Sequence, residues 1–243
     1  ICDTIDSACY ISNYDSLNNI PEFNQGLFYI QDYSSQLVCY KAVIKENDRV
    51  LDVCAAPGGK ALHAAQFAYN GTVEARDLTE AKIAIINENI QRTGATNITA
   101  KQWDATEFDQ TAENKYDVVI ADLPCSGLGI IRKKPDIKYN QSEESLKELV
   151  KLQATILENV CKYVKAGGTL CYSTCTINKD ENESQVNEAC DWIGITATRL
   201  NAQLLKSVFG PLCKSPVVID PTAAPAVFEE QVLVAAGWKP GFS

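Results

Sequence analysis

Short apolar runs alternate with helix-length amphipathic segments along most of this chain, and no other feature limits its fold as tightly. The runs have the length of buried strands, and the segments between them repeat their apolar residues at the spacing of a helix. Strands alternating with helices predict an α/β fold in which a mostly parallel, twisted sheet carries helices on both faces. The strands are predicted at residues 50–53, 72–75, 98–102, 117–121 and 169–172, and the helices at 60–68, 80–92, 142–164 and 179–190.

The first 47 residues lack a clean period and contain turn signals such as Asn18-Asn19 and Pro21. They predict a small N-terminal cap that leads into a helix near residues 34–44. With 243 residues, the chain is long enough to bury a core without disulfides or a metal. We therefore expect a cap over residues 1–47 and one α/β domain over residues 48–243.

A glycine-rich turn follows the first predicted strand of the α/β domain. Its glycines let the backbone turn tightly and approach a ligand, and the helix behind it offers free N–H groups. Ligands of parallel sheets bind beyond the carboxyl ends of the strands, which is where this turn lies. A simple strand–helix turn explains the bare pattern equally well, because it is neither a dinucleotide fingerprint nor a Walker loop. The turn reads Cys54-Ala55-Ala56-Pro57-Gly58-Gly59-Lys60.

Three carboxylates stand at the ends of the next three strands. Asp77 ends the second strand, where a carboxylate binds ribose hydroxyls in dinucleotide folds. Asp104 ends the third strand, where it either hydrogen-bonds an adenine amine or caps the segment that follows. Asp122 ends the fourth strand, where a partly buried carboxylate can hydrogen-bond the N3 edge of a pyrimidine and share a proton with it.

Two cysteines follow the fourth and fifth strands, Cys125 in the segment DLPCSG and Cys175 in the segment YSTCT. A free thiol has a pKa of about 8.5, so a reactive cysteine needs nearby cations or helix N-termini. A single cysteine is more often an inert core residue. Two thiols in polar loops at one edge of the sheet, beside a glycine turn, suggest nucleophilic chemistry next to a nucleotide-like cofactor.

Composition argues against several other classes of protein. The ten cysteines are scattered through strand and helix patterns, which favours a reducing cytosol over a disulfide scaffold. With no Cys-x-x-Cys pair and His63 as the single histidine, we expect no metal site and no Ser-His-Asp triad. No apolar run approaches the roughly 20 residues of a membrane span.

A net charge of −9 argues against a generic nucleic-acid binder. A basic cluster just after the Cys125 segment is the local exception. Charge alone is consistent with a solvated loop, but the position beside a candidate catalytic cysteine favours contacts with phosphates. The cluster consists of Arg132, Lys133, Lys134 and Lys138.

The segments VLDVCAAPGGK, ADLPCSGLGIIRKKPDIKY and GGTLCYSTCTINKDEN resemble the signature blocks of S-adenosylmethionine-dependent RNA cytosine-5 methyltransferases. The resemblance is closest to the bacterial 16S ribosomal RNA enzymes of the Sun/Fmu (RsmB) type and runs from about Gly26 to Glu188. It implies a Rossmann-like fold and transfer of a methyl group from S-adenosylmethionine to C5 of a cytosine in RNA. The expected substrate is 16S ribosomal RNA.

The resemblance also implies a role for each motif residue. Cys175 is expected to attack C6 of cytosine as the nucleophile, and Cys125 to assist elimination and release of the product. Asp122 is expected near both the reactive centre and the target base. The cofactor-binding residues implied in this way are Cys54, Ala55, Ala56, Pro57, Gly58, Gly59, Lys60, Asp77, Asp104 and Asp122.

The chain departs from the family pattern in three places. Leu123 stands where the family usually has alanine, and residues 216–243 are atypical. The RNA-binding helical domain that normally precedes the catalytic part has no counterpart here, so we expect a piece of a longer chain. Two alternatives therefore stay open: a transfer RNA cytosine-5 methyltransferase, or a non-catalytic fragment that binds RNA or the cofactor. In each case a cytoplasmic monomer is expected.

Overall fold

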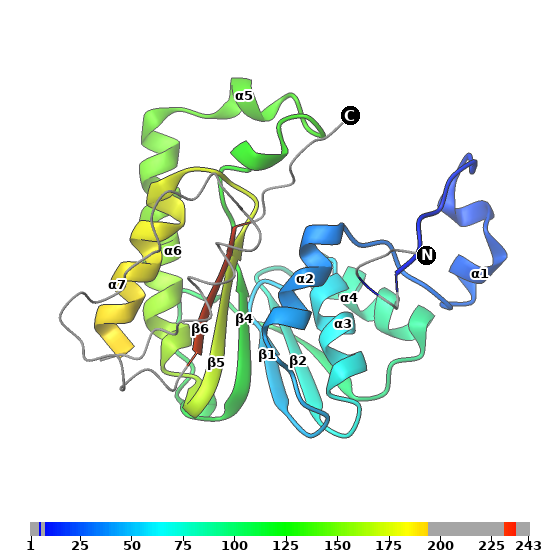
Figure 1. Ribbon diagram of the computed structural model, residues 1–243, viewed down its shortest axis with the longest axis horizontal. Coiled ribbons are helices and arrows are strands. Elements are labelled where there is room, and N and C mark those ends of the chain that lie inside the picture. The colour runs from blue at the N-terminus through cyan, green and yellow to red at the C-terminus, as the bar shows by residue number, and fades with distance from the viewer. Residues whose placement is uncertain (1–4, 6–7, 194–230, 237–243) are drawn as a thin grey trace.

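Six parallel strands form one sheet in the computed structural model, which describes residue 5, residues 8–193 and residues 231–236 (Figure 1). Their order across the sheet is β3-β2-β1-β4-β5-β6, and every neighbouring pair runs parallel. This arrangement confirms the predicted α/β class. The strands are β1 (Arg49–Asp52), β2 (Thr72–Asp77), β3 (Ile98–Gln102), β4 (Tyr116–Asp122), β5 (Val164–Thr174) and β6 (Gln231–Ala236).

Helices cover both faces of the sheet, as expected (Figure 1). Successive side chains of a strand point to opposite faces, so each strand contributes to two cores. Val50 and Val118 join one core, whereas Leu51 and Val119 join the other. The first core is covered by α2 (Tyr33–Lys41), α3 (Gly59–Phe67) and α4 (Glu80–Thr93), and the second by α6 (Glu143–Cys161) and α7 (Glu183–Ile193).

Helix boundaries follow local signals in the sequence. Gly94 ends α4 in the left-handed conformation, with φ of 67°. Ser142 begins α6, and its side chain and that of Ser145 each accept a hydrogen bond from the other residue's backbone N–H. The short helical turns of the described chain are η1 (Leu17–Asn19), α1 (Pro21–Asn24), η2 (Gln110–Ala112), η3 (Leu128–Ile130), α5 (Ile137–Asn140) and η4 (Lys179–Glu181).

The boundary between α6 and β5 differs from the prediction. The helix predicted at residues 142–164 ends earlier, at Cys161, and the glycine pair Gly167-Gly168 that follows lies inside β5. Gly167 has a φ of 77°, and the register between β4 and β5 shifts at this part of the strand. The glycines therefore accommodate an irregularity within a strand that pairs on both sides of it.

The helix predicted at residues 179–190 is divided in two. Asn182, with φ of −124° and ψ of −91°, separates η4 from α7. The Asn182 side chain forms hydrogen bonds with the end of β5 and the loop that follows it. Thr174 Oγ1 donates to Asn182 Oδ1 over 2.6 Å, and Asn182 Nδ2 donates to the Thr176 carbonyl over 3.0 Å.

The N-terminal region has two parts, α2 and the segment before it, and each packs differently. α2 belongs to the first core, where Val38 and Cys39 are buried. The segment before it lies against α4, since Arg92 Nη1 donates to the carbonyls of Phe23 and Phe28 over 2.8 and 3.0 Å. Gly26 is required there, because a Cβ atom would lie 1.7 Å from the Arg92 carbonyl oxygen.

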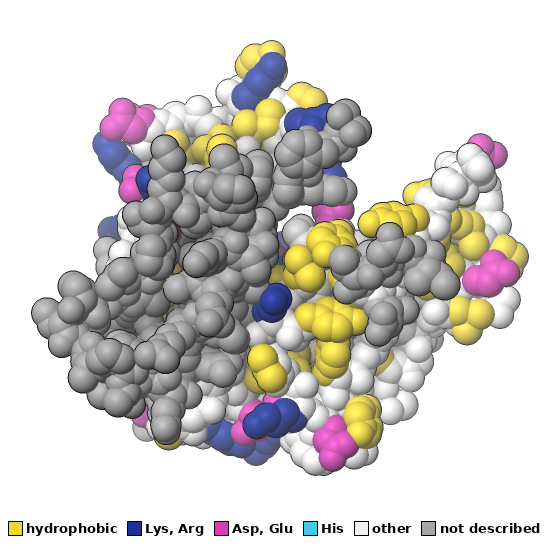
Figure 2. Space-filling model, in the orientation of Figure 1, with side chains coloured by type: hydrophobic (Ala, Val, Ile, Leu, Met, Phe, Trp, Pro, Cys, Tyr) yellow, Lys and Arg dark blue, Asp and Glu magenta, His cyan; other side chains and the backbone are white. Residues whose placement is uncertain are grey.

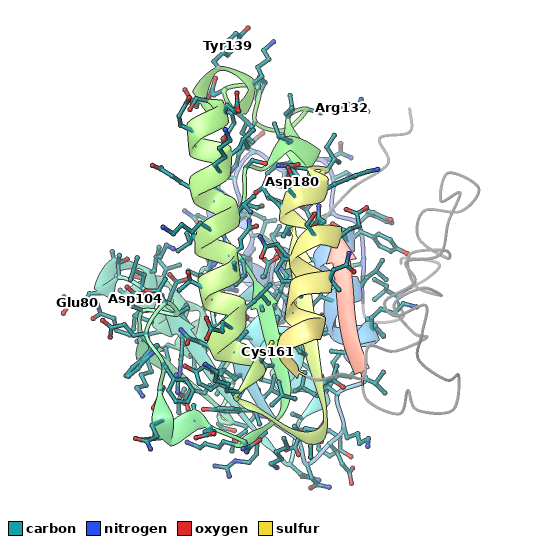
Figure 3. The ribbon with its side chains drawn as sticks, turned by 90° about the vertical axis from the view of Figure 1, so that its left-hand side faces the viewer. Glu80, Asp104, Arg132, Tyr139, Cys161 and Asp180 are labelled. Atoms are coloured by element: carbon teal, nitrogen blue, oxygen red, sulfur yellow. The ribbon has the colours of Figure 1, made fainter. Side chains whose placement is uncertain are left out.

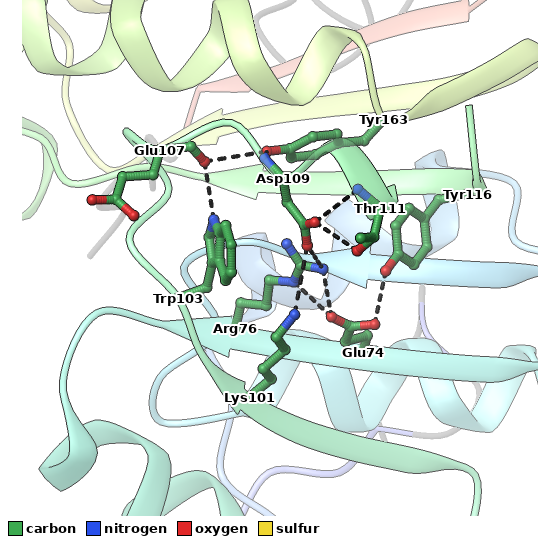
Figure 4. Close-up of polar contacts among 9 residues, drawn as sticks. All are labelled: Glu74, Arg76, Lys101, Trp103, Glu107, Asp109, Thr111, Tyr116 and Tyr163. Atoms are coloured by element: carbon green, nitrogen blue, oxygen red, sulfur yellow. Dashed lines mark hydrogen bonds and ion pairs between the residues drawn. The ribbon is translucent and has the colours of Figure 1, made fainter. Parts of the chain in front are cut away.

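A buried ion cluster joins β2 to the segment before β4 (Figure 4). Arg76 is 2% exposed and pairs with Glu74 at 2.6 Å and with Asp109 at 2.9 Å. Tyr116 Oη donates to the other oxygen of Glu74 over 2.8 Å. Burial raises the pKa of Asp109, but hydrogen bonds from Thr111 and the charge of Arg76 outweigh it and lower the pKa to about 2.

Of the atypical segment 216–243, only β6 lies within the described residues. Among these residues, none of the helices combines the length and the apolar character needed to cross a membrane. The same part of the chain contains no group of three or more His, Cys, Asp or Glu side chains that could hold a metal ion.

Candidate active site

The polar motifs meet where the chain reverses its direction across the sheet. From β1 it proceeds outward through β2 to β3 and then returns to β4 on the other side of β1. Such a switch point opens a crevice beyond the carboxyl ends of the strands, where ligands of α/β folds bind. The glycine turn follows β1, and the Cys125 segment follows β4 directly beside it.

Backbone hydrogen bonds fix the conformation of the glycine turn. Ala55 N–H donates to the Arg76 carbonyl over 2.8 Å, and Gly58 N–H donates to the Ala55 carbonyl over 2.6 Å. Gly58 precedes α3 with a φ of 104°, a conformation that side-chain-bearing residues rarely adopt. The turn thus presents backbone and the first turn of α3 to the crevice.

The carboxylates at the ends of β2 and β3 make different contacts. Asp77 is buried and accepts hydrogen bonds from the N–H groups of Ala56 and Leu78, and its Oδ1 lies 2.8 Å from Lys82 Nζ. Asp77 therefore ties the glycine turn to β2. Asp104 Oδ1 accepts from the backbone and hydroxyl of Thr106, so the capping alternative is observed. A ligand contact by Asp104 stays a prediction.

A lysine and an aspartate connect the glycine turn to the end of β4. Lys60 Nζ in the first turn of α3 lies 2.5 Å from Asp122 Oδ2, and Ser173 Oγ donates to Asp122 Oδ1 over 2.7 Å. Burial lowers the pKa of Lys60, but the charge and hydrogen bond of Asp122 raise it by more. The Asp122 side chain is 33% exposed, so the pair is partly accessible to solvent.

Asp52 lies beneath this pair and was not singled out in the sequence. It ends β1 with no exposed surface, and neither carboxyl oxygen has a hydrogen-bond partner among the described residues. Burial raises its pKa to about 7, while Lys60 opposes the shift. Burial and the charge of Asp52 likewise raise the pKa of the Cys54 thiol, so Cys54 remains neutral. The sequence signal that could have identified Asp52 is its position as a single carboxylate in an otherwise apolar run.

The two motif cysteines lie in direct contact. Their Sγ atoms are 3.2 Å apart, and the Cys175 N–H donates to Cys125 Sγ over 3.2 Å. A hydrogen bond from the Cys125 thiol lowers the pKa of Cys175, and the same hydrogen bond together with burial raises the pKa of Cys125. The pair therefore favours a Cys175 thiolate supported by a neutral Cys125 thiol.

Three further thiols and the histidine lie in or beside the core. Cys39 and Cys171 are buried in the core, and Cys161 is half-buried at the end of α6. His63 is buried in α3 with its ring centroid 5.1 Å from that of Phe67, and burial lowers its pKa to about 4. His63 is thus a neutral core residue.

The predicted basic cluster is exposed and lies in the connection from β4 to α6 (Figure 3). Lys133 forms an ion pair with Asp32, the residue before α2. Lys138 Nζ lies 4.7 Å from the ring centroid of Tyr139. In Figure 3, Arg132 and Tyr139 lie at the same end of the molecule as Asp180, near the start of α7. In the space-filling view, Lys and Arg side chains gather over this connection and α5 (Figure 2).

Comparison with known proteins identifies the relatives of the chain. The sequence model described as 16S rRNA methyltransferase RsmB/F matches residues 41–229. The probable ribosomal RNA small subunit methyltransferase B of Bacillus subtilis is 42% identical over 68% of this chain and 37% of its own length. Ribosomal RNA small subunit methyltransferase F of Escherichia coli is 36% identical over 73% of this chain and 37% of its own.

Solved structures from Pyrococcus horikoshii share the fold and part of the sequence. NSun6 from Pyrococcus horikoshii, determined with SFG, is 32% identical with a TM-score of 0.65, over 71% of this chain and 44% of that one. A methyltransferase homologue from the same organism is 31% identical with a TM-score of 0.64, over 72% and 55%. The chain spans less than two thirds of each relative's length. By its sequence and fold, it belongs to the RsmB/F family of 16S rRNA methyltransferases.

Proposed function

We propose that this chain transfers a methyl group from S-adenosylmethionine to C5 of a cytosine in RNA through a covalent Cys175–C6 intermediate. The expected RNA is 16S ribosomal RNA. The observation that carries the proposal is the pair of thiols in contact at the carboxyl edge of the sheet, beside the glycine turn and the Lys60–Asp122 pair. Membership of the RsmB/F family supports the same reaction class.

The residues around the turn fit a nucleoside-containing methyl donor. Gly58 has no Cβ atom to obstruct a ligand at the turn, and no side chain caps the N-terminus of α3, where the first N–H groups lack partners within the helix. Asp77 and Asp104 stand at the ends of adjacent strands, where carboxylates receive ribose hydroxyls and an adenine amine. S-adenosylmethionine supplies an electrophilic methyl group on a sulfonium. The proposed contacts extend over the whole turn from Cys54 to Lys60.

The proposed nucleophile is the Cys175 thiolate. C5 of cytosine is a poor nucleophile, and addition of a thiolate at C6 gives C5 the character of an enamine carbon. A proton from the Lys60 ammonium, 2.5 Å from Asp122, is shared through Asp122 with N3 as negative charge develops on the ring, and it returns to Lys60 when the product forms. C5 then takes the methyl group, with S-adenosylhomocysteine as the second product.

Product release requires two bonds to break. The C5 proton leaves, the electron pair reforms the C5–C6 double bond, and the Cys175–C6 bond breaks to return the thiolate. Cys125 assists this elimination, because its thiol lies 3.2 Å from the departing sulfur and stabilises the thiolate by hydrogen bonding. The products are 5-methylcytosine, S-adenosylhomocysteine and a proton.

The target cytosine has to leave its stack to reach the thiols, which costs a few kcal/mol when it is paired or stacked. The basic cluster Arg132, Lys133, Lys134 and Lys138 provides exposed cations for the flanking phosphates, despite the acidic balance of the whole chain. We further propose that residues 1–47 form a cap, that residues 48–243 form the catalytic domain, and that the protein is a cytoplasmic monomer without a metal.

Transfer of radiolabelled methyl from S-adenosylmethionine to 16S ribosomal RNA and to bulk transfer RNA tests this function. We expect label in 16S ribosomal RNA, and none with Cys175→Ala because the nucleophile is gone. The matched control is Cys161→Ala, which removes a thiol at the C-terminal end of α6, away from the basic cluster (Figure 3). This variant is expected to retain full activity. Label only in transfer RNA would overturn the substrate, and substantial label with Cys175→Ala would overturn the mechanism.

A further inference from the structure

A buried carboxylate joins the two cysteine loops from behind. Glu181 lies in η4 with no exposed surface, and its side chain faces the residues that directly follow the two cysteines, Ser126 after Cys125 and Thr176 after Cys175. These two segments are 50 residues apart in sequence. One side chain therefore contacts both loops at the position adjacent to each thiol.

Hydrogen bonds from the Cys125 loop use both oxygens of Glu181. The Ser126 N–H donates to Oε2 over 2.8 Å, and the Ser126 hydroxyl donates to Oε1 over 2.5 Å. From the Cys175 loop, Thr176 Oγ1 lies 3.3 Å from Oε1 and 2.7 Å from Ser126 Oγ. The carboxylate and two hydroxyls thus form one connected network between the loops.

Helix α6 completes this network from the other side. Gln153, fully buried in α6, donates through Nε2 to Glu181 Oε2 over 3.1 Å and to the Pro124 carbonyl over 2.8 Å. Pro124 and Ser126 flank Cys125, so both neighbours of this cysteine are fixed. Asn178 Nδ2 adds a donor to Oε1 over 3.2 Å.

Within the described residues, no ion pair involves Glu181. Its neighbours are neutral donors, which is the arrangement that keeps a buried carboxylate tolerable without a cation. An apolar side chain would fill the space at lower desolvation cost. Only a side chain with two acceptor oxygens can accept hydrogen bonds from both loops at the same time.

We propose that Glu181 is a positioning residue that fixes the separation of the two thiols. The catalytic meaning of this role rests on the proposed function, because attack by one thiol and release assisted by the other require them in contact. The positioning itself is a property of the protein alone. A probe that reports thiol separation without RNA or cofactor therefore tests it directly.

Phenylarsine oxide is a suitable probe, since its arsenic condenses with two nearby thiols to form two As–S bonds and releases one water. We expect the wild-type chain to be bridged at Cys125 and Cys175, and Glu181→Gln to be bridged at least about tenfold more slowly, because the amide presents a donor where an acceptor is needed. Intact mass spectrometry follows the reaction, and Cys125→Ser and Cys175→Ser define the contribution of other thiols.

Two further variants keep the test decisive. Thr176→Val removes one hydroxyl at constant shape, is expected to slow bridging as well, and stands in if Glu181→Gln does not fold. Glu158→Gln is the matched control, because Glu158 is an exposed α6 carboxylate paired with Lys162. Circular dichroism verifies folding of every variant. Wild-type bridging rates in folded Glu181→Gln, or in Thr176→Val where Glu181→Gln is unfolded, would overturn the proposal whether or not the chain methylates RNA.

Methylation provides a second readout. The turnover number of Glu181→Gln is expected to fall with the slower bridging, while its Kd for S-adenosylmethionine stays that of the wild type, since Glu181 contacts the thiol loops and not the glycine turn. A loss of cofactor affinity with unchanged bridging would assign Glu181 to general stability and contradict the positioning role.

Discussion

At the scale of single residues, the contact with Cys125 is the largest influence on the pKa of Cys175 and lowers it, and the charge of Lys60 acts in the same direction. The two Sγ atoms lie 3.2 Å apart, and a neutral thiol at this distance stabilises a thiolate on its partner by donating a hydrogen bond to it. The sequence indicated both cysteines and Asp122, because they follow recognisable strands. It did not indicate Asp52 or Glu181, whose importance comes from burial and from contacts between distant segments.

The pH dependence of stability tests the burial of Asp52. Its pKa of about 7 lies above the unfolded value near 3.8, so between these pH values the native state holds a proton that the unfolded state releases. The free energy of unfolding therefore falls as pH rises through this range, by up to about 4 kcal/mol.

Asp52→Asn, which does not titrate, is expected to lose this component and to gain stability relative to the wild type at pH 8. Urea denaturation at pH 5 and pH 8 measures how the free energy of unfolding of each protein changes with pH. An equal change of unfolding free energy with pH in the wild type and in Asp52→Asn would show that Asp52 is ionised throughout and that its surroundings differ from those described.

At the scale of elements, local signals predicted where most helices and strands begin and end. Ser142 and Gly94 ended up as caps because capping depends on neighbouring residues only. The helix predicted over residues 142–164 reaches the first residue of β5, because the glycine pair behind it is compatible with either a turn or an irregular strand. Only the pairing with β4, a contact distant in sequence, decides between these two conformations.

The glycine turn can be tested against a glycine of similar geometry elsewhere. Gly58→Ala places a side chain at a φ of 104°, and Gly94→Ala places one at 67°, with no atom within 4 Å of the new Cβ in the latter case. Both variants are expected to lose about 1–2 kcal/mol of stability.

Only Gly58→Ala is expected to lose affinity for S-adenosylmethionine as well, by at least about tenfold, because its strain reshapes the turn. Isothermal titration and thermal unfolding separate the two effects. Equal cofactor affinity in both variants would count against the turn as the binding element.

At the scale of the whole molecule, alternating elements predicted a parallel sheet covered on both faces, and this is the fold observed. The strand order places β4 beside β1, which brings the Cys125 loop to the glycine turn although they are distant in sequence. The buried ion cluster around Arg76 was not predicted, since its members lie in three separate segments (Figure 4).

Removal of Arg76 tests how this cluster contributes to stability. Arg76→Met leaves the carboxylates of Glu74 and Asp109 without their buried cation, and we expect a loss of about 3–5 kcal/mol. The control Lys147→Met breaks an exposed pair with Glu143 and is expected to cost at most about 0.5 kcal/mol. Urea denaturation compares the two, and similar losses would contradict the buried character of the cluster.

The most direct test of the two-thiol mechanism is to trap its intermediate. Cys125→Ala, incubated with S-adenosylmethionine and 16S ribosomal RNA, is expected to form a protein–RNA adduct that survives a denaturing gel, because Cys175 attacks C6 and its release is impaired. The Cys125→Ala, Cys175→Ala double variant is expected to form none. An adduct that persists in the double variant, or its absence in Cys125→Ala under conditions where the wild type methylates the RNA, would contradict the assignment of the two cysteines.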